Sequence, residues 1–218
     1  MTVLRDTEAM APPVPSGLEL YPYQQEGFRF AINRLRTNRG AMFGDVMGLG
    51  KTIEAIGTAN AMVPHRILVV CPASVLFTWR REIWKWQTLA LPVLLIQAGL
   101  DTTINHGLVR WGVNGWYVIN YDILRDYTEI KSGKPWDLLI LDESHKVKNP
   151  EAIRTQHVFG SDTIAPIPAE KVLLLTGTPM INYVHDMYTQ LHCLDPAMWP
   201  SFEHARTTGT GYPRYQLR

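Results

Sequence analysis

Gly44-Asp45-Val46-Met47-Gly48-Leu49-Gly50-Lys51-Thr52 is the stretch of sequence that decides the fold. Residues 40–43 before it are apolar enough for a short buried strand, and residues 53–62 after it are typical of a helix. A strand, a glycine-rich turn and a helix that opens on Gly-Lys-Thr form the layout of a P-loop, a loop that binds phosphate. A strand-to-helix turn that needs glycine only for tight packing would have the same pattern.

In a P-loop, backbone N–H groups turn inward around a phosphate, and the start of the helix adds unpaired donors and a positive dipole end. The predicted nucleotide-binding residues of this loop are Met47, Gly48, Leu49, Gly50, Lys51 and Thr52. The Lys51 ammonium can reach the outer phosphates, and the Thr52 hydroxyl can ligate Mg²⁺. The strict pattern has glycine five residues before Gly50, where this chain has Asp45.

Length and composition indicate one large globular domain. The chain has 218 residues, of which 46% are hydrophobic and 19% charged, and its net charge is +1. Any contact with nucleic acid therefore has to come from a local patch of charge. The separated Cys71 and Cys193 fit a reduced, intracellular protein, and neither a membrane-spanning run nor a signal peptide is visible, so we expect no membrane partner.

The remaining apolar runs predict an α/β fold. Runs at residues 67–71, 93–96, 117–121, 138–141 and 172–175 read as further strands, and helical or loop segments separate them. This alternation favours a mostly parallel central sheet with helices on both faces. We expect a flexible arm over residues 1–17, the domain over 18–206 and a polar tail over 207–218. The irregular segments 99–116 and 160–170 are expected to be loops.

Helical spacing predicts two of the helices in more detail. Phe28, Ile32 and Leu35 lie on one side of an amphipathic helix, and Ser74 is expected to cap a helix that runs to about Trp86. Polar residues also follow each strand directly. The carboxyl ends of parallel strands share one edge, so we expect these residues at a single rim: Lys51, Ser74, Asn120, Asp142 and Thr176.

The pair Asp142-Glu143 follows four apolar residues and gives the second half of the nucleotide argument. Two adjacent carboxylates repel each other unless a positive group lies near, and Mg²⁺ bound to ATP meets that need. Asp142 can hold the Mg²⁺ shell, while Glu143 can orient and deprotonate a water molecule. The alternative is an aspartate that caps the next helix, with the glutamate solvated in its first turn.

Three weaker patterns leave alternatives open. The Gln24 amide can read an adenine edge, although an exposed glutamine is the ordinary case. Residues 176–179 form either a simple turn or a sensor of phosphate state. A tryptophan-rich basic segment suggests a nucleic-acid face, but helical spacing favours a buried stripe of Leu76, Trp79, Ile83 and Trp86, with Arg80, Arg81 and Lys85 solvated. His185, His192 and Cys193 lack a second close ligand pair, which argues against zinc.

Taken together, the motifs resemble the first RecA-like lobe of Swi/Snf-type DNA translocases in helicase superfamily two, from Leu20 to about Pro196. Residues 45–52 are similar to that family's Asp-Glu-Met-Gly-Leu-Gly-Lys-Thr, which also carries aspartate at the position of Asp45. The further similar segments are residues 20–24 (the adenine-reading segment), 70–74 with Trp79, Glu82, Lys85 and Trp86 (motif Ia), 120–122, 142–149 (the Asp-Glu-Ala-His box) and 175–179 with Asn182 (motif III).

The resemblance implies an ATP-binding lobe that belongs to a motor moving on double-stranded DNA, with ATP and Mg²⁺ bound. It implies that Gln24 reads adenine, that Lys51 and Glu143 are catalytic, and that Thr52 and Asp142 serve the Mg²⁺. It implies coupling through Thr176, Gly177 and Thr178, and weaker contacts to the DNA backbone from Ser74, Asn120 and Lys148.

Two residues depart from the family pattern: Val46 replaces an acidic residue, and Ser144 replaces alanine. Nothing in the 218 residues resembles the family's second lobe, which carries the arginine fingers, so we expect a partner lobe on another chain or in a longer protein.

One rival function is a non-catalytic, nucleotide-dependent DNA-binding or adaptor module. An RNA helicase lobe is another, but RNA helicases of the Asp-Glu-Ala-Asp type usually carry Ser-Ala-Thr at Thr176-Gly177-Thr178.

Overall fold

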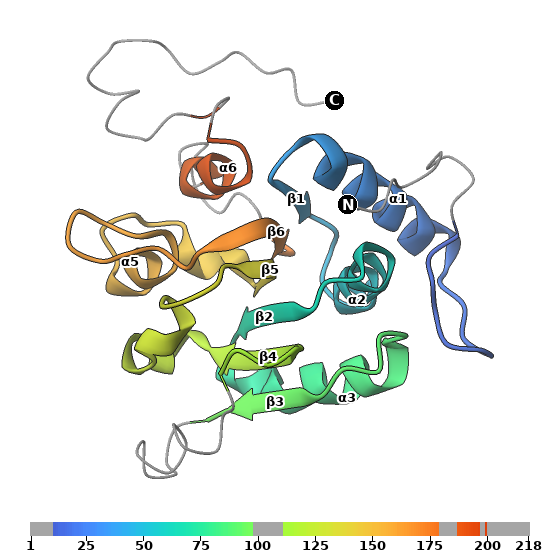
Figure 1. Cartoon of the computed structure of the whole chain (residues 1–218). Coiled ribbons are helices and arrows are strands. Elements are labelled where there is room, and N and C mark those ends of the chain that lie inside the picture. Colours follow the sequence, from blue (N-terminus) through green and yellow to red (C-terminus); the bar gives the residue numbers. More distant parts are fainter. Residues whose placement is uncertain (1–10, 98–110, 179–186, 197–198, 200–218) are drawn as a thin grey trace.

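A computed structural model describes residues 11–97, 111–178, 187–196 and 199 of the chain (Figure 1). Its α-helices are α1 (Pro22–Thr37), α2 (Lys51–Met62), α3 (Leu76–Trp86), α5 (Ile153–Phe159) and α6 (Tyr188–Leu194). Its strands are β1 (Gly40–Phe43), β2 (Arg66–Cys71), β3 (Val93–Ile96), β4 (Gly115–Asn120), β5 (Trp136–Asp142) and β6 (Ala169–Leu175). Short 3₁₀ turns are η2 (Ala73–Val75), η3 (Tyr121–Asp126), η4 (Thr128–Ile130) and η5 (Ser144–Val147).

The strands form one six-stranded sheet in the order β1-β6-β5-β2-β4-β3. Every pair of neighbouring strands is parallel. Helices α1, α2 and α3 pack on one face of the sheet, and α5, α6 and the turns η3 to η5 pack on the other. The α/β fold with a parallel sheet covered on both faces is therefore confirmed.

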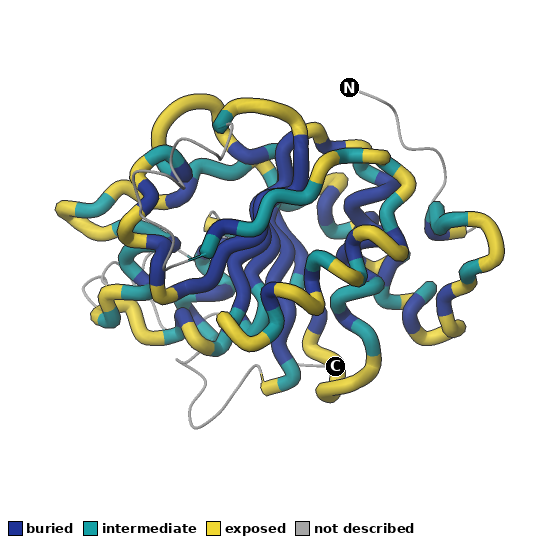
Figure 2. Tube along the Cα trace, turned by 90° about the horizontal axis from the view of Figure 1, so that it is seen from below, coloured by how far each residue is buried: buried dark blue, intermediate teal, exposed yellow. Residues whose placement is uncertain are grey.

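The buried strands explain why the sequence shows continuous apolar runs. Every residue of β2 and of β4 is buried, because alternate side chains enter the cores on the two faces of the sheet. Figure 2 shows this as a dark central band with exposed loops around it. The predicted faces of the helices are also confirmed, since Phe28, Ile32 and Leu35 are buried in α1.

Several predicted boundaries differ from the structure. Gly115 and Trp116, expected in a loop, are the first residues of β4, and β6 begins three residues earlier than predicted, at Ala169. Strand pairing extends past the apolar run in both cases, because backbone hydrogen bonds set a strand's length. The added residues of β6 are not fully buried, whereas Gly115 and Trp116 of β4 are. Residues 98–110 and the predicted tail 207–218 lie outside the described residues.

Two local predictions are corrected. Ser74 does not cap a helix: it lies in η2, and α3 begins at Leu76 after Val75, without a side-chain cap bond. Residues 11–17, expected in a flexible arm, contact the domain: Pro12 is buried, and the Pro13 carbonyl accepts a hydrogen bond from Asn60 Nδ2 at 2.9 Å. Asn60 supplies this contact from α2, which hydropathy alone does not indicate.

Among the described residues, no helix combines the length and apolar character needed to cross a membrane.

Candidate active site

The loop of residues 44–50 joins the end of β1 to the start of α2. Gly50 has φ +87° and stands at the N-cap of α2, in the left-handed region where other residues are strained. A Cβ atom at Gly50 would also displace the Gln24 amide. The backbone conformation favours glycine here, so the loop turns at the position where the P-loop pattern predicts.

Lys51 is the first residue of α2, and only 9% of its surface is exposed. Its Nζ donates hydrogen bonds to the carbonyl oxygens of Asp45, at 2.6 Å, and Val46, at 3.2 Å. The ammonium is thus held inside the curve of the loop, beside the backbone N–H groups at the start of the helix. Such a cluster of donors and positive charge suits a phosphate group.

Gln24 lies next to the same loop, from α1. Its Nε2 donates to the Leu49 carbonyl at 3.0 Å, and its Oε1 accepts from the Tyr21 backbone N–H at 3.0 Å. The side chain is only 3% exposed. The structure therefore gives Gln24 a contact that the sequence did not predict, between the start of α1 and the loop, and places its amide beside the predicted phosphate site.

The strand order brings the predicted rim together. In register, Phe43 pairs with Leu175, Leu175 pairs with Asp142, and Cys71 pairs with Asn120, so the five polar segments follow parallel strands at one edge of the sheet. β6 lies between β1 and β5, which puts Thr176 between the loop and the carboxylate pair. The Thr176 backbone N–H donates to the Phe43 carbonyl at 3.0 Å.

Gly177 lies directly against the loop. A Cβ atom there would be 2.8 Å from Met47 Cγ and 3.3 Å from the Met47 backbone nitrogen. Glycine permits this approach without a shift of the loop. The segment 176–178 therefore packs against the loop on one side and, as described next, its two threonines lie against the His145 ring on the other.

Asp142 ends β5, and its two carboxylate oxygens accept different hydrogen bonds. Oδ2 accepts from Trp79 Nε1 at 2.8 Å, and Oδ1 accepts from the Glu143 backbone N–H at 3.0 Å. Burial raises the pKa of Asp142, while the Trp79 bond opposes that rise. A carboxylate that is partly desolvated and fixed in orientation suits a divalent cation, which supplies the missing charge.

Glu143 begins a short network that reaches motif III. His145 Nδ1 lies 3.2 Å from Glu143 Oε2, 3.2 Å from Thr176 Oγ1 and 3.4 Å from Thr178 Oγ1. Burial lowers the pKa of His145, which favours the neutral ring, and the neighbouring Glu143 carboxylate opposes that shift. A neutral imidazole nitrogen can donate to a carboxylate or accept from a hydroxyl, depending on its tautomer. The ring thus links the predicted base to the predicted coupling residues.

The three residues predicted to contact DNA occupy different environments. Ser74 is exposed in η2, at the rim. Asn120 is buried, and its Oδ1 accepts from the backbone N–H groups of Asp122 and Ile123 as the cap of η3. These two bonds occupy the Asn120 Oδ1, so its Nδ2 is the group that can donate to a phosphate. The Lys148 side chain is half-buried, and its backbone carbonyl accepts from Thr189 Oγ1 at 2.9 Å.

Sequence reasoning missed the polar roles of two residues at this site. Trp79 was correctly expected in the core, but its indole N–H, which needs a partner when buried, bonds Asp142. Glu54 is buried in α2, one turn after the loop, at a position to which the sequence analysis gave no role. Burial and the Asp45 carboxylate raise its pKa to about 7.

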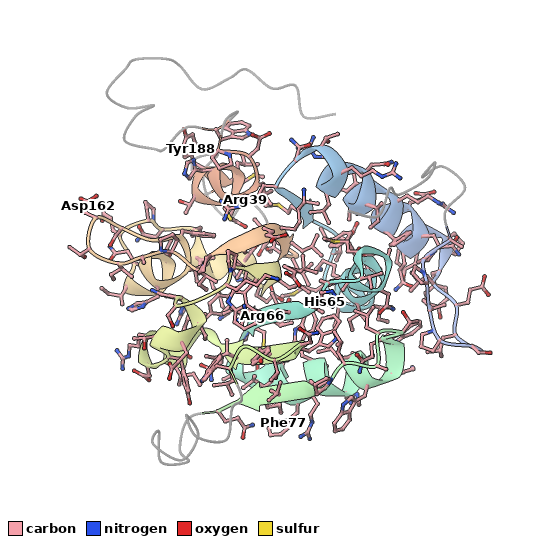
Figure 3. The ribbon with its side chains drawn as sticks, viewed as in Figure 1. Arg39, His65, Arg66, Phe77, Asp162 and Tyr188 are labelled. Atoms are coloured by element: carbon pink, nitrogen blue, oxygen red, sulfur yellow. The ribbon has the colours of Figure 1, made fainter. Side chains whose placement is uncertain are left out.

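The basic, tryptophan-rich helix α3 is divided as helical spacing predicted. Leu76, Trp79, Ile83 and Trp86 are buried. Phe77, labelled in Figure 3, and Trp84 are exposed on the outer side, and Arg80 lies 5.1 Å from each of their rings. Among the described residues, no three His, Cys, Asp or Glu side chains form a group that could hold a metal; His185 lies outside that part of the chain.

The parallel sheet, the glycine-turned loop and the carboxylate pair at one rim define a RecA-like lobe of the kind found in helicase superfamily two. A model of the SNF2-related domain matches residues 23–208, and the chain belongs to this family. Among its relatives, the DNA excision repair protein ERCC-6-like of Danio rerio is 34% identical over 181 residues, which are 78% of this chain and 12% of that protein.

Two further similarities support the family. The SWI/SNF-related matrix-associated actin-dependent regulator of chromatin subfamily A-like protein 1 of Bos taurus is 33% identical over 84% of this chain and 18% of that protein. The solved Sulfolobus solfataricus SWI2/SNF2 ATPase core in complex with dsDNA matches with a TM-score of 0.74 and 25% identity, covering 87% of this chain and 38% of that one. The chain thus spans less than a fifth of the length of these two curated relatives.

Proposed function

We propose that the chain is the ATP-binding lobe of an ATP-dependent motor that moves on double-stranded DNA. The observation that carries the proposal is the loop with Lys51 held inside it, adjacent to Thr176 and, one strand further, to Asp142 and Glu143. This is the arrangement that nucleoside triphosphate hydrolysis requires: donors for the phosphates, a ligand for the metal and a base for water.

In the proposed site, the backbone from Met47 to Gly50 and the Lys51 ammonium bind the phosphates, and Gln24 with its neighbours binds the adenine. Thr52 and Asp142 hold the Mg²⁺, which when bound neutralises charge on the phosphates. Glu143 orients the water molecule and accepts its proton. Thr176, Gly177 and Thr178 report the phosphate state to the rest of the lobe, because they contact both Met47 and His145.

The proposed DNA contact lies on the same rim, where Ser74, Asn120 and Lys148 follow or flank the strands. The SWI2/SNF2 core similar to this chain is bound to double-stranded DNA, which supports DNA as the partner. That core is also more than twice as long as the matched lobe, since the match covers 38% of it. We therefore propose a second RecA-like lobe, in the same protein or on a partner, as the other half of the motor.

Titration of a fluorescent ATP analogue with Mg²⁺ tests the proposal. Lys51→Ala should abolish measurable binding, a loss of at least about 100-fold if the ammonium makes more than one charged hydrogen bond to phosphate. Lys134→Ala is the matched control, because Lys134 is exposed and precedes β5 at the opposite edge of the sheet, so its affinity should equal that of the parent. Equal affinities for all three proteins would remove Lys51 from the site and overturn the proposal.

A further inference from the structure

Helix α6 is bonded to both ends of the turn η5. Ser144 Oγ, at the start of η5, donates to Gln190 Oε1 at 2.6 Å. Thr189 Oγ1 donates to the backbone carbonyl of Lys148, just after η5, at 2.9 Å. Two successive residues of α6, the helix that begins at Tyr188 (Figure 3), thus fix a turn more than forty residues earlier in the chain.

The Ser144–Gln190 bond is fully buried, since both side chains are 0% exposed. Gln190 Nε2 finds no hydrogen-bond partner among the described residues, so Ser144 supplies the bond that its amide makes there. A buried polar group that loses its partner has lost its bond to water as well, which makes the loss costly. Ser144 is also the position where the chain departs from the alanine of the Asp-Glu-Ala-His box. Its additional hydroxyl therefore has a specific partner.

η5 carries the network that links the base to motif III. It follows Glu143 directly, and the Lys146 backbone N–H donates back to the Glu143 carbonyl at 2.9 Å. His145, its second residue, lies within 3.4 Å of Glu143, Thr176 and Thr178 side-chain atoms. A shift of η5 would move the ring away from at least one of these three partners.

We propose that Gln190 is a positioning residue that acts through Ser144. By holding the first residue of η5, it keeps His145 between Glu143 and the motif III threonines, and so sets the rate of hydrolysis without contacting the nucleotide. This inference rests on the proposed ATPase role of Glu143. It makes α6 part of the hydrolytic machinery, although the helix lies on the face of the sheet opposite α2 and its loop.

The test is a double-mutant cycle on the 218-residue chain with Ser144→Ala, Gln190→Leu and the two combined. Gln156→Leu is the matched control, because the Gln156 amide donates to the backbone carbonyl of Glu151, at an exposed contact that does not involve η5. Three quantities are measured: amide exchange in residues 143–148 and in α2, affinity for an ATP analogue, and the rate of single-turnover hydrolysis at saturating ATP.

Each single variant should exchange amide hydrogens about ten-fold faster in residues 143–148 and hydrolyse ATP about ten-fold more slowly, as expected when a buried group loses its partner. Exchange in α2 and ATP affinity should stay within about two-fold of the parent. The combined variant should lose no more than either single variant, because the bond that holds η5 is already absent in each of them.

The inference is overturned if the single variants leave hydrolysis unchanged, if α2 and η5 lose protection equally, or if the combined variant shows the sum of the two losses. Should Gln190→Leu fail to fold, Ser144→Ala decides alone, because it removes the bond with the loss of a single oxygen atom. A parent chain that binds no ATP would defeat the proposed function, while the exchange data would still decide whether Gln190 holds η5.

Discussion

Glu143 is held in a left-handed backbone conformation, with φ +50° and ψ +50°. This conformation costs a residue with a Cβ roughly 1–2 kcal/mol, so the surrounding contacts must stabilise it. It turns the chain sharply at the end of β5, between the Asp142 carboxylate and His145. Strain at a residue with a proposed catalytic role fits a site in which side-chain position matters more than backbone stability.

Replacement of Glu143 by glutamine should preserve ATP binding and stop hydrolysis in an assembled motor. Glutamine keeps the shape and the capacity to touch water, but it cannot accept the proton. General-base catalysis contributes about 10²–10⁴-fold, so the turnover rate should fall by at least 100-fold. ATPase assays with the exposed Glu151→Gln as control check this, and unchanged turnover of Glu143→Gln would show that the base lies elsewhere.

Glu54 gives the chain a predictable response to pH. It is 1% exposed, and its pKa is raised from 4.5 to about 7, chiefly by burial. A carboxyl group with a raised folded-state pKa contributes stability that is complete below about pH 4.5 and is lost as the pH rises through about 7.

Glu54→Gln should therefore be more stable than the parent above about pH 8, by on the order of 2–3 kcal/mol, and nearly equal to it near pH 4.5. Urea unfolding across this pH range, in the absence of nucleotide, measures the difference. Parallel pH profiles for the two proteins would show that the Glu54 carboxylate is already compensated in the folded state.

For single residues, the sequence predicted where the functional side chains lie better than it predicted their hydrogen-bond partners. The glycine pattern and the Asp-Glu pair located the loop and the carboxylates, because local backbone and charge requirements are visible in a few adjacent residues. It could not predict the bond from Trp79 to Asp142 or from Gln190 to Ser144, since those partners lie 63 and 46 residues apart and meet only through tertiary packing.

Among the elements, α3 connects the packing of the sheet to the predicted metal ligand. Its buried stripe lies on one face of the sheet, and from that stripe the Trp79 indole bonds Asp142 at the end of β5. Helical periodicity predicted the buried stripe correctly, but it placed the start of the helix near Ser74, because it cannot distinguish the turn η2 from the first turn of a helix.

Trp79→Phe should lower the free energy of unfolding by about 1–3 kcal/mol, because the ring stays in the core while the half-buried Asp142 carboxylate loses one of its two donors. Trp84→Phe, on the same helix and 62% exposed, is the matched control and should change stability by less than about 0.5 kcal/mol. Chemical denaturation of both variants decides the matter. Equal effects would show that the Trp79–Asp142 bond contributes nothing to stability.

The whole molecule presents one edge of a parallel sheet, on which the proposed phosphate, metal and DNA contacts all lie. Alternating apolar runs predicted this arrangement, because a parallel sheet needs crossover helices and its strand ends then share an edge. The order of the strands was beyond prediction from these runs: β6, the last of the described strands in sequence, lies between β1 and β5. That insertion, which places Thr176 between the loop and the carboxylates, is a property of long-range pairing.

The purified 218-residue chain should bind Mg²⁺ and ATP but hydrolyse ATP very slowly, with little or no stimulation by DNA. Lys51 is the ammonium that the described residues hold against the loop, and with Mg²⁺ it would neutralise only part of the transition-state charge. In related NTPases an arginine finger from a second domain or partner contributes about 10³–10⁵ in kcat, or roughly 4–7 kcal/mol of barrier. Two of the described arginines are already engaged away from the loop, Arg66 with the Lys134 carbonyl and Arg154 with Asp122.

Steady-state ATPase assays with and without duplex DNA, over a dilution series, measure this expectation. DNA-dependent turnover on the order of 10 s⁻¹, typical of enzymes, that did not change with protein concentration would contradict it. Turnover that rises with concentration would instead indicate that a neighbouring copy supplies the missing charge. Addition of a second-lobe protein should restore both the rate and its dependence on DNA, because two lobes can then close on one duplex.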